Sequence, residues 1–196
     1  MKFQEAIAKH FRLRGNVAIG KVHKRVNRGR WGLAHAMEDM EFRTGVEVGS
    51  LYGDSAELWC SVNPQLKLTC VDPYGNYRGR RRQSEHDAVY KATCERLAKF
   101  SVTMVRKTGL AAVGDFQDRS LDFVHIDADH SFDGVIVDLV TWAPKVRRGG
   151  LIFLHDYFSL KWRGATQAID AYIVAHRIHT WYATPDVTPT IFWEQR

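Results

Sequence analysis

The sequence predicts an α/β fold, in which a mostly parallel sheet has helices on both faces and ends in a C-terminal antiparallel hairpin. From residue 44 onward, short segments rich in Val, Ile, Leu and Phe alternate with segments of helical periodicity. This alternation is typical of βαβ units with right-handed crossovers. Near the C-terminus two apolar segments are joined only by Ala183–Pro189. That connection is too short for a helical crossover, so these two strands are expected to be antiparallel.

The expected elements follow one another regularly along the chain. Five parallel strands are predicted at Gly45–Val48, Leu66–Val71, Val102–Val105, Leu121–Ile126 and Leu151–Leu154. Helices are predicted at Ser55–Val62, Glu85–Phe100, Leu110–Phe116, Phe132–Trp142 and Ala165–His176. The hairpin strands are predicted at Ile178–Tyr182 and Thr190–Trp193, which makes a seven-stranded sheet.

Residues 1–43 differ from this pattern in charge and periodicity. Apolar residues recur at helical spacing from Phe3 to Phe11, Gly15-Asn16 is typical of a helix end, and Val17–Arg30 indicates a basic loop. A second helix is expected at Trp31–Met40. The first 30 residues hold nine Lys or Arg and one acidic residue, whereas the rest hold nineteen and twenty-one. We therefore divide the chain into a basic helical arm or lid, 1–43, and a nearly neutral domain, 44–196.

The composition is that of an ordinary globular protein, with 45% hydrophobic and 26% charged residues. Its apolar runs all fall short of the roughly 18 residues that a membrane span needs, so we expect no membrane partner. Cys60, Cys70 and Cys94 are scattered and odd in number, which suits a reducing compartment and a cytoplasmic location. The sequence leaves the oligomeric state open.

A glycine turn follows the first predicted strand, in the segment VEVGSLYGDS that begins at Val46. Gly49 allows the backbone to turn tightly and approach a ligand, and Asp54 with Glu57 indicates a capping box that starts the next helix. The spacing differs from the G-x-G-x-x-G pattern that admits a pyrophosphate, which disfavours a nicotinamide-dependent oxidoreductase. A cofactor without phosphates needs instead a partner for an amine, and Glu47 provides a carboxylate.

An acidic residue ends the second predicted strand, about 20 residues beyond the turn. Asp72 is placed to accept hydrogen bonds from ribose hydroxyls. Pro73 stiffens the exit from this strand, and Tyr74 is expected to pack near the ligand. The turn and Asp72 together indicate a nucleoside-containing cofactor more strongly than either does alone.

Acidic and imidazole side chains follow the next two strands of the expected sheet. Asp127 and His130 come after Leu121–Ile126, and His155-Asp156 comes after Leu151–Leu154. Neighbouring parallel strands lie about 4.8 Å apart, so these side chains are expected to converge. Two carboxylates and an imidazole at one rim favour Mg²⁺ or Mn²⁺, and His130 is a candidate general base for an acceptor hydroxyl. Asp129 or Ser131 is expected to cap the following helix.

Together these motifs resemble class I S-adenosylmethionine-dependent methyltransferases, over about residues 44–194. The most specific part runs from Ser120 to Tyr157 and is similar to small bacterial O-methyltransferases of the macrocin type. The resemblance implies a Rossmann-like fold with S-adenosyl-L-methionine as cofactor. The methionine part would lie near Glu47, the ribose near Asp72 and the adenine near Thr108. The implied cofactor-binding residues are Glu47, Gly49, Ser50, Gly53, Asp72, Pro73, Tyr74, Thr108, Gly109 and Asp127.

The resemblance also implies roles at the methyl-transfer centre. In metal-dependent members an Asp-x-x-His segment supplies a metal ligand and the base, and Asp127 and His130 match it here. Their second acidic pair falls on His155-Asp156, where histidine replaces the first acid. We therefore expect Asp127, His130 and Asp156 to be catalytic, and Asp127, His155 and Asp156 to be the metal ligands.

The function predicted is O-methylation of a hydroxyl group on a small molecule of the sugar or natural-product type, assisted by Mg²⁺ or Mn²⁺. The basic segments Lys21–Arg30 and Arg78–Arg82 are either solvated loops or a clamp for an anionic acceptor. A nucleic-acid methyltransferase with a phosphate-tracking arm is one alternative, and it predicts steep salt dependence of substrate binding. A second alternative is a non-catalytic protein that binds S-adenosylmethionine.

Overall fold

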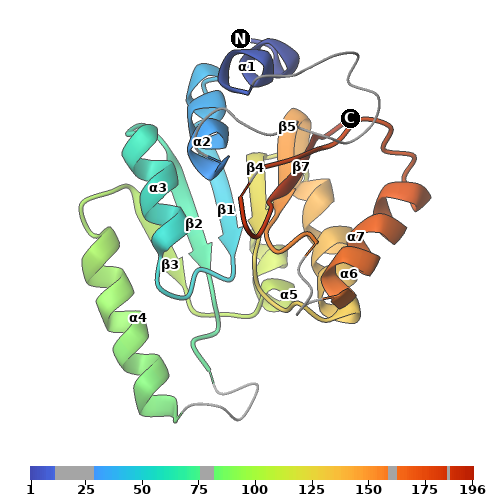
Figure 1. The fold of residues 1–196 in the computed structure, drawn as a ribbon. Coiled ribbons are helices and arrows are strands. Elements are labelled where there is room, and N and C mark those ends of the chain that lie inside the picture. Colours follow the sequence, from blue (N-terminus) through green and yellow to red (C-terminus); the bar gives the residue numbers. More distant parts are fainter. Residues whose placement is uncertain (12–28, 76–81, 159–162, 185) are drawn as a thin grey trace.

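A computed structural model describes residues 1–11, 29–75, 82–158, 163–184 and 186–196 of the chain (Figure 1). Its centre is a seven-stranded sheet with the strand order β3-β2-β1-β4-β5-β7-β6. The strands are β1 (Thr44–Val48), β2 (Lys67–Val71), β3 (Val102–Val105), β4 (Leu121–Ile126), β5 (Val146–Leu154), β6 (Tyr182–Ala183) and β7 (Ile191–Glu194). β7 runs antiparallel to both its neighbours, and the pairs from β3 to β5 are parallel. The predicted fold class is therefore confirmed.

Helices cover both faces of this sheet (Figure 1). They are α1 (Phe3–His10), α2 (Gly29–Asp39), α3 (Asp54–Val62), α4 (Gln83–Leu97), α5 (Gly109–Ala112), α6 (Phe132–Trp142) and α7 (Arg163–Ala175), with short 3₁₀ turns η1 (Val113–Asp115) and η2 (Ala143–Lys145). Among these helices, none is long and apolar enough to cross a lipid bilayer.

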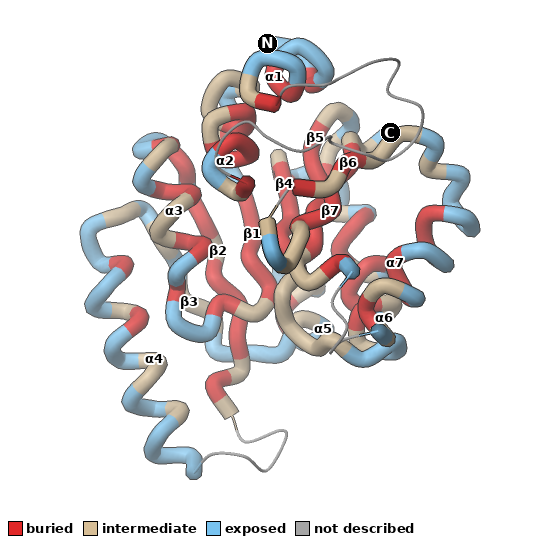
Figure 2. Tube along the Cα trace, in the orientation of Figure 1, coloured by how far each residue is buried: buried red, intermediate tan, exposed pale blue. Residues whose placement is uncertain are grey.

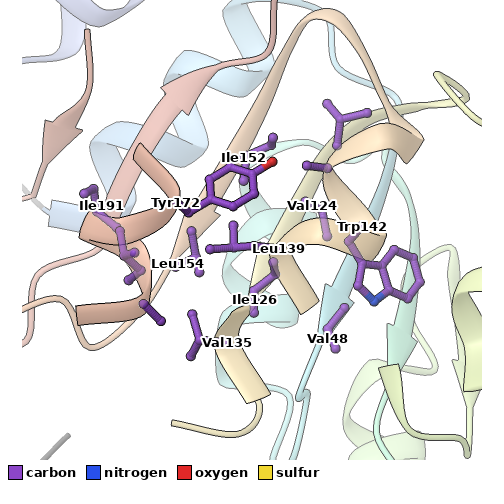
Figure 3. Close-up of a cluster of buried hydrophobic side chains, with 14 of the residues drawn as sticks. Val48, Val124, Ile126, Val135, Leu139, Trp142, Ile152, Leu154, Tyr172 and Ile191 are labelled. Carbon is purple, nitrogen blue, oxygen red and sulfur yellow. The ribbon is translucent and has the colours of Figure 1, made fainter. Parts of the chain in front are cut away.

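One face of the sheet forms a core with α5, α6 and α7. Alternate strand residues such as Val124 and Ile152 point to this face and pack against Leu139 and Trp142 of α6 (Figure 3). The other face carries Phe123 and Phe153, because successive side chains of a strand point to opposite faces. Figure 2 shows the strands buried along most of their length, as expected for a sheet covered on both sides.

The second face is covered by helices from the N-terminal segment as well as by α3 and α4. Phe3 and Ile7 of α1 and Leu33 of α2 are buried in the same cluster as Phe123 and Phe192. The described part of the basic arm therefore packs onto the sheet and completes its core. The expected helix end at Gly15-Asn16 and most of the basic loop lie outside the described residues.

Three local predictions were wrong. The strand expected at Ile178–Tyr182 is only Tyr182–Ala183, because the Ile178 amide donates to the Ile173 carbonyl and so still closes the end of α7. β5 begins at Val146, five residues earlier than expected, because Gly149 and Gly150 continue the strand. Arg30, assigned to the loop, is the second residue of α2.

The capping box at the start of α3 is also absent. Gly53, with a left-handed φ of 75°, is the N-cap, and Asp54 already lies inside the helix. Asp54 and Glu57 instead pair with Arg96 of α4, at 2.5 and 2.7 Å. Ser131, in contrast, caps α6 as predicted, since its hydroxyl accepts a hydrogen bond from the Gly134 amide.

Candidate active site

A cleft of about 350 Å³ lies where β1, β2 and β4 end. Its described lining comes from the turn after β1, the starts of α2 and α3, and the segments that follow β2 and β4. The lining residues are Arg30, Glu47, Gly49, Ser50, Leu51, Tyr52, Asp54, Ser55, Asp72, Pro73, Asp127, Ala128 and His130. The volume lies within the roughly 300–1,000 Å³ usual for small-molecule sites. Seven of the sequence-predicted site residues thus meet in one cleft.

The turn after β1 requires glycine for a reason that the sequence did not reveal. Gly49 has a φ of 94°, and a Cβ added to it would lie 2.2 Å from the backbone oxygen of Asp127. The close approach is therefore between the end of β1 and the end of β4. This contact holds the turn against the segment that carries the candidate catalytic residues.

Glu47 is buried at the floor of the cleft and bound to a residue that the sequence analysis did not single out. Its Oε1 lies 2.9 Å from Nδ1 of His125, on β4, and the carboxylate assigns the imidazole proton to Nδ1. The His125 ring is fully buried between Trp59 and Phe153. Burial raises the pKa of Glu47, and the His125 hydrogen bond opposes that rise. His125 thus fixes the orientation of Glu47 and favours its ionised form.

Asp72 fastens the turn as well as lining the cleft. One of its oxygens accepts a hydrogen bond from the Leu51 amide (3.1 Å) and the other from the Tyr74 amide (2.8 Å). Burial raises the pKa of Asp72, and these two hydrogen bonds oppose the rise. Tyr74 is buried beneath the turn and donates its hydroxyl to the Leu51 carbonyl, so it supports the cleft wall and does not line it.

Three side chains from the ends of β4 and β5 gather beside the cleft. His130 Nε2 lies 3.2 Å from Asp127 Oδ1 and 2.8 Å from Asp156 Oδ2. One ligand atom from each of the three lies within 4.8 Å of the others. Asp156 has a φ of 60°, an uncommon backbone conformation for a residue other than glycine. The predicted convergence of these strand ends is therefore present in the structure.

This cluster is strongly coupled electrostatically. Burial disfavours a charged His130, but the hydrogen bonds to Asp127 and Asp156 outweigh it and raise its pKa to about 9. The hydrogen bond with His130, and after it the one with His155, lowers the pKa of Asp156. At neutral pH His130 therefore carries a proton and holds the two carboxylates together.

His155, predicted to be a metal ligand, lies beside this group. Its Nδ1 is 3.8 Å from Asp127 Oδ2 and 3.4 Å from Asp156 Oδ1, while its Nε2 lies 3.3 Å from the Thr188 hydroxyl. The group whose donor atoms converge contains His130 in place of His155. Each of the two histidines lies within 4 Å of both carboxylates, so the role of His155 as a metal ligand stays a prediction.

The residues expected near adenine begin α5. The Thr108 hydroxyl caps this helix by accepting from the Ala111 amide. A Cβ on Gly109 would lie 2.7 Å from the Asp138 carboxylate and 2.8 Å from Val48. Neither Thr108 nor Gly109 is among the described lining of the cleft.

Asp138 of α6 is a buried acid whose protonation should affect stability. Burial, with a smaller contribution from Asp129, raises its pKa from 3.8 to about 7. The unfolded chain releases this proton near pH 4 and the folded chain near pH 7, so stability falls as pH rises between these values. We expect Asp138→Asn to raise the free energy of unfolding at pH 8 by about 2 kcal/mol. Urea denaturation at pH 8 and pH 4.5 measures this, and an equal effect at both pH values would contradict it.

Arg30 is a second residue that the sequence analysis did not single out for the cleft. It lies at the start of α2, and its Nη1 donates to the Ser55 hydroxyl at 2.7 Å. Its charge also lowers the pKa of Glu47 slightly. In the sequence Arg30 is one of several basic residues, and only the packing of α2 against α3 shows that it belongs to the cleft. The other predicted basic segment, Arg78–Arg82, is described only at Arg82, the N-cap of α4.

Two further hollows, of about 210 and 490 Å³, lie at the opposite edge of the sheet, where the parallel strands begin. The first is lined by residues that include Tyr172 and Trp193, and the second by residues that include Phe42 and Arg147. The acidic and imidazole groups that follow β1, β2, β4 and β5 lie at the other edge. We therefore take the cleft over Gly49 as the candidate active site.

Comparison with known proteins shows the family to which the chain belongs. A family model described as a methyltransferase domain matches residues 46–157, the stretch that contains the glycine turn and the ends of β4 and β5. An uncharacterized protein of Sinorhizobium fredii is 29% identical over 140 residues, which cover 65% of this chain. The chain spans only 14% of the length of that relative.

Solved structures share the fold at low sequence identity. The O-methyltransferase TomG of Streptomyces achromogenes, involved in tomaymycin synthesis and solved with S-adenosylmethionine, has a TM-score of 0.64 and 12% identity, covering 99% of this chain and 89% of TomG. The Podospora anserina methyltransferase PaMTH1, solved with S-adenosylhomocysteine, has a TM-score of 0.64 and 13% identity, covering 98% and 88%.

Proposed function

This chain belongs to the methyltransferase-domain family, and we propose that it transfers a methyl group from S-adenosylmethionine to a hydroxyl oxygen of a small molecule. One observation carries the proposal: the cleft over the Gly49 turn is acidic. Glu47, Asp54, Asp72 and Asp127 line it, against Arg30 and a protonated His130. Such a surface attracts a cofactor that carries a sulfonium and an ammonium group and has no phosphate.

The residues of the cleft fit that cofactor by their chemistry. Glu47 presents a carboxylate that His125 orients, and it suits the ammonium group. Asp72 lines the cleft beside the turn, where a carboxylate oxygen that already accepts one backbone hydrogen bond retains a lone pair for a ribose hydroxyl. When bound, S-adenosylmethionine supplies a methyl group activated by its sulfonium. The contribution of the protein is then to align the acceptor oxygen and to take its proton.

Asp127, His130 and Asp156 are suited to that second task. The carboxylates of Asp127 and Asp156 are hard oxygen donors that would hold Mg²⁺ or Mn²⁺, and His130, which lies beside both, is the base. A bound divalent ion supplies Lewis acidity that lowers the pKa of an acceptor hydroxyl. His130 must release the proton it shares with the two carboxylates before it accepts one from the substrate. The acceptor is proposed to be of the sugar or natural-product type, which the role of TomG in tomaymycin synthesis supports.

The test combines binding and turnover. Calorimetry should show S-adenosylmethionine binding and no NADH binding, and a screen of hydroxylated acceptors should yield S-adenosylhomocysteine with Mg²⁺ present. We expect His130→Ala to lower turnover by about 10²–10⁴-fold. Binding of NADH without binding of S-adenosylmethionine would refute the proposed function. Activity that persists after exhaustive chelation would refute the proposed metal ion but not the proposed methyl transfer.

A further inference from the structure

We propose that Arg30, which α2 brings into the cleft, recognises the α-carboxylate of the cofactor's methionine group. This inference rests on the proposed function, because it concerns how the same cleft selects its cofactor. The amino-acid end of S-adenosylmethionine is a zwitterion at neutral pH. A site complementary to both charges offers an anion for the ammonium group and a cation for the carboxylate.

The cleft supplies one such cation next to one such anion. Among its described lining residues Arg30 is the only lysine or arginine, whereas four are acidic. Arg30 and Glu47 both line this cleft, and the Arg30 charge lowers the pKa of the buried Glu47 carboxylate. His130, the remaining cationic group of the lining, is held by Asp127 and Asp156. The charge pattern thus assigns the ammonium to Glu47 and the carboxylate to Arg30.

Ser55 sets the position of the guanidinium group. Its hydroxyl accepts one Arg30 N–H at 2.7 Å, and Ser55 is 7% exposed. A guanidinium has five N–H donors in a planar fork that matches a carboxylate, so this contact uses one of them and fixes the plane of the others. Ser55 acts as acceptor in this bond, so its hydroxyl hydrogen can serve as a second donor at the same place. Both groups line the cleft.

The experiment compares two ligands that differ only in the carboxylate. Calorimetry gives the dissociation constants of S-adenosylmethionine and of decarboxylated S-adenosylmethionine for the wild-type protein and for Arg30→Gln. Wild type should bind the complete cofactor about tenfold or more tightly, as expected for a charge-assisted hydrogen bond. In Arg30→Gln this preference should fall to near one, through weaker binding of S-adenosylmethionine and nearly unchanged binding of the decarboxylated form.

Two further variants separate recognition from a structural role. Arg148→Gln removes the same charge from an exposed position near the start of β5, at the opposite edge of the sheet, and should keep the wild-type preference. Arg30→Lys keeps the charge without the planar fork and should retain part of the preference. If Arg30→Gln weakens both ligands equally, or leaves the preference unchanged, Arg30 does not read the carboxylate. If wild type binds neither ligand, the proposed function itself fails.

Discussion

Gly49→Ala is expected to destabilise the protein by about 4 kcal/mol or more and to abolish cofactor binding. The added Cβ would lie 2.2 Å from the Asp127 oxygen, 2.5 Å from the Asp127 carbonyl carbon and 2.7 Å from the Ala128 Cα, all of them backbone atoms. A side chain could rotate away from such a contact, but backbone has to move. The φ of 94° adds strain for any residue with a Cβ. Relief therefore requires β1 and β4 to separate at the site.

Urea denaturation and calorimetry with S-adenosylmethionine measure the two losses. Gly114→Ala is the matched control, because no atom lies within 4 Å of its added Cβ. We expect that variant to stay within about 1 kcal/mol of wild type. Wild-type stability in Gly49→Ala would show that the ends of β1 and β4 are farther apart in solution than in this structure.

The second large effect concerns the buried pair of Glu47 and His125. His125→Phe keeps a ring between Trp59 and Phe153 but removes the hydrogen bond to Glu47. Leaving a buried carboxylate without its partner lowers the free energy of unfolding by about 3–5 kcal/mol. The pKa of Glu47 is already raised by burial, and this loss raises it further. For an acid with a raised pKa in the folded state, stability declines as pH rises through that pKa, so the defect should be larger at pH 8 than at pH 5.

A double variant distinguishes the electrostatic cause from a packing defect. Glu47→Gln combined with His125→Phe removes the buried charge, so it should recover most of the stability at pH 8 and still bind S-adenosylmethionine poorly. Urea denaturation at pH 5 and pH 8, with calorimetry at pH 8, tests both statements. Equal destabilisation in the single and double variants would assign the loss to packing of the ring.

The sequence predicted the elements of the sheet well because their periodicity records burial. Val46, Val48 and Ile126 lie in strands that are covered on both faces, and their apolar side chains reflect that burial. The edge strands were harder to predict. β6 has two residues, and whether Ile178 ends a helix or begins a strand depends on one backbone hydrogen bond to Ile173.

The candidate site was predictable where the topology alone brings residues together. Asp127 and Asp156 follow neighbouring parallel strands, so they had to meet at one edge. Two relationships depended on tertiary packing instead. In the sequence His125 resembles any strand residue, and only the register of β1 and β4 places it opposite Glu47. Arg30 resembles the rest of a basic segment, and only the packing of α2 on α3 brings it to the cleft.

The position of α1 has a consequence for how the chain folds during synthesis. Phe3 packs against Tyr182 of β6, with ring centroids 5.7 Å apart, and Phe11 packs against Phe192 of β7, at 5.8 Å. Contacts that span nearly the whole chain form slowly, because a long loop must close before they can stabilise anything. The ribosome releases the first of these rings long before the last, at about 5–20 residues per second. For that interval the apolar side of α1 lacks its partners on β6 and β7.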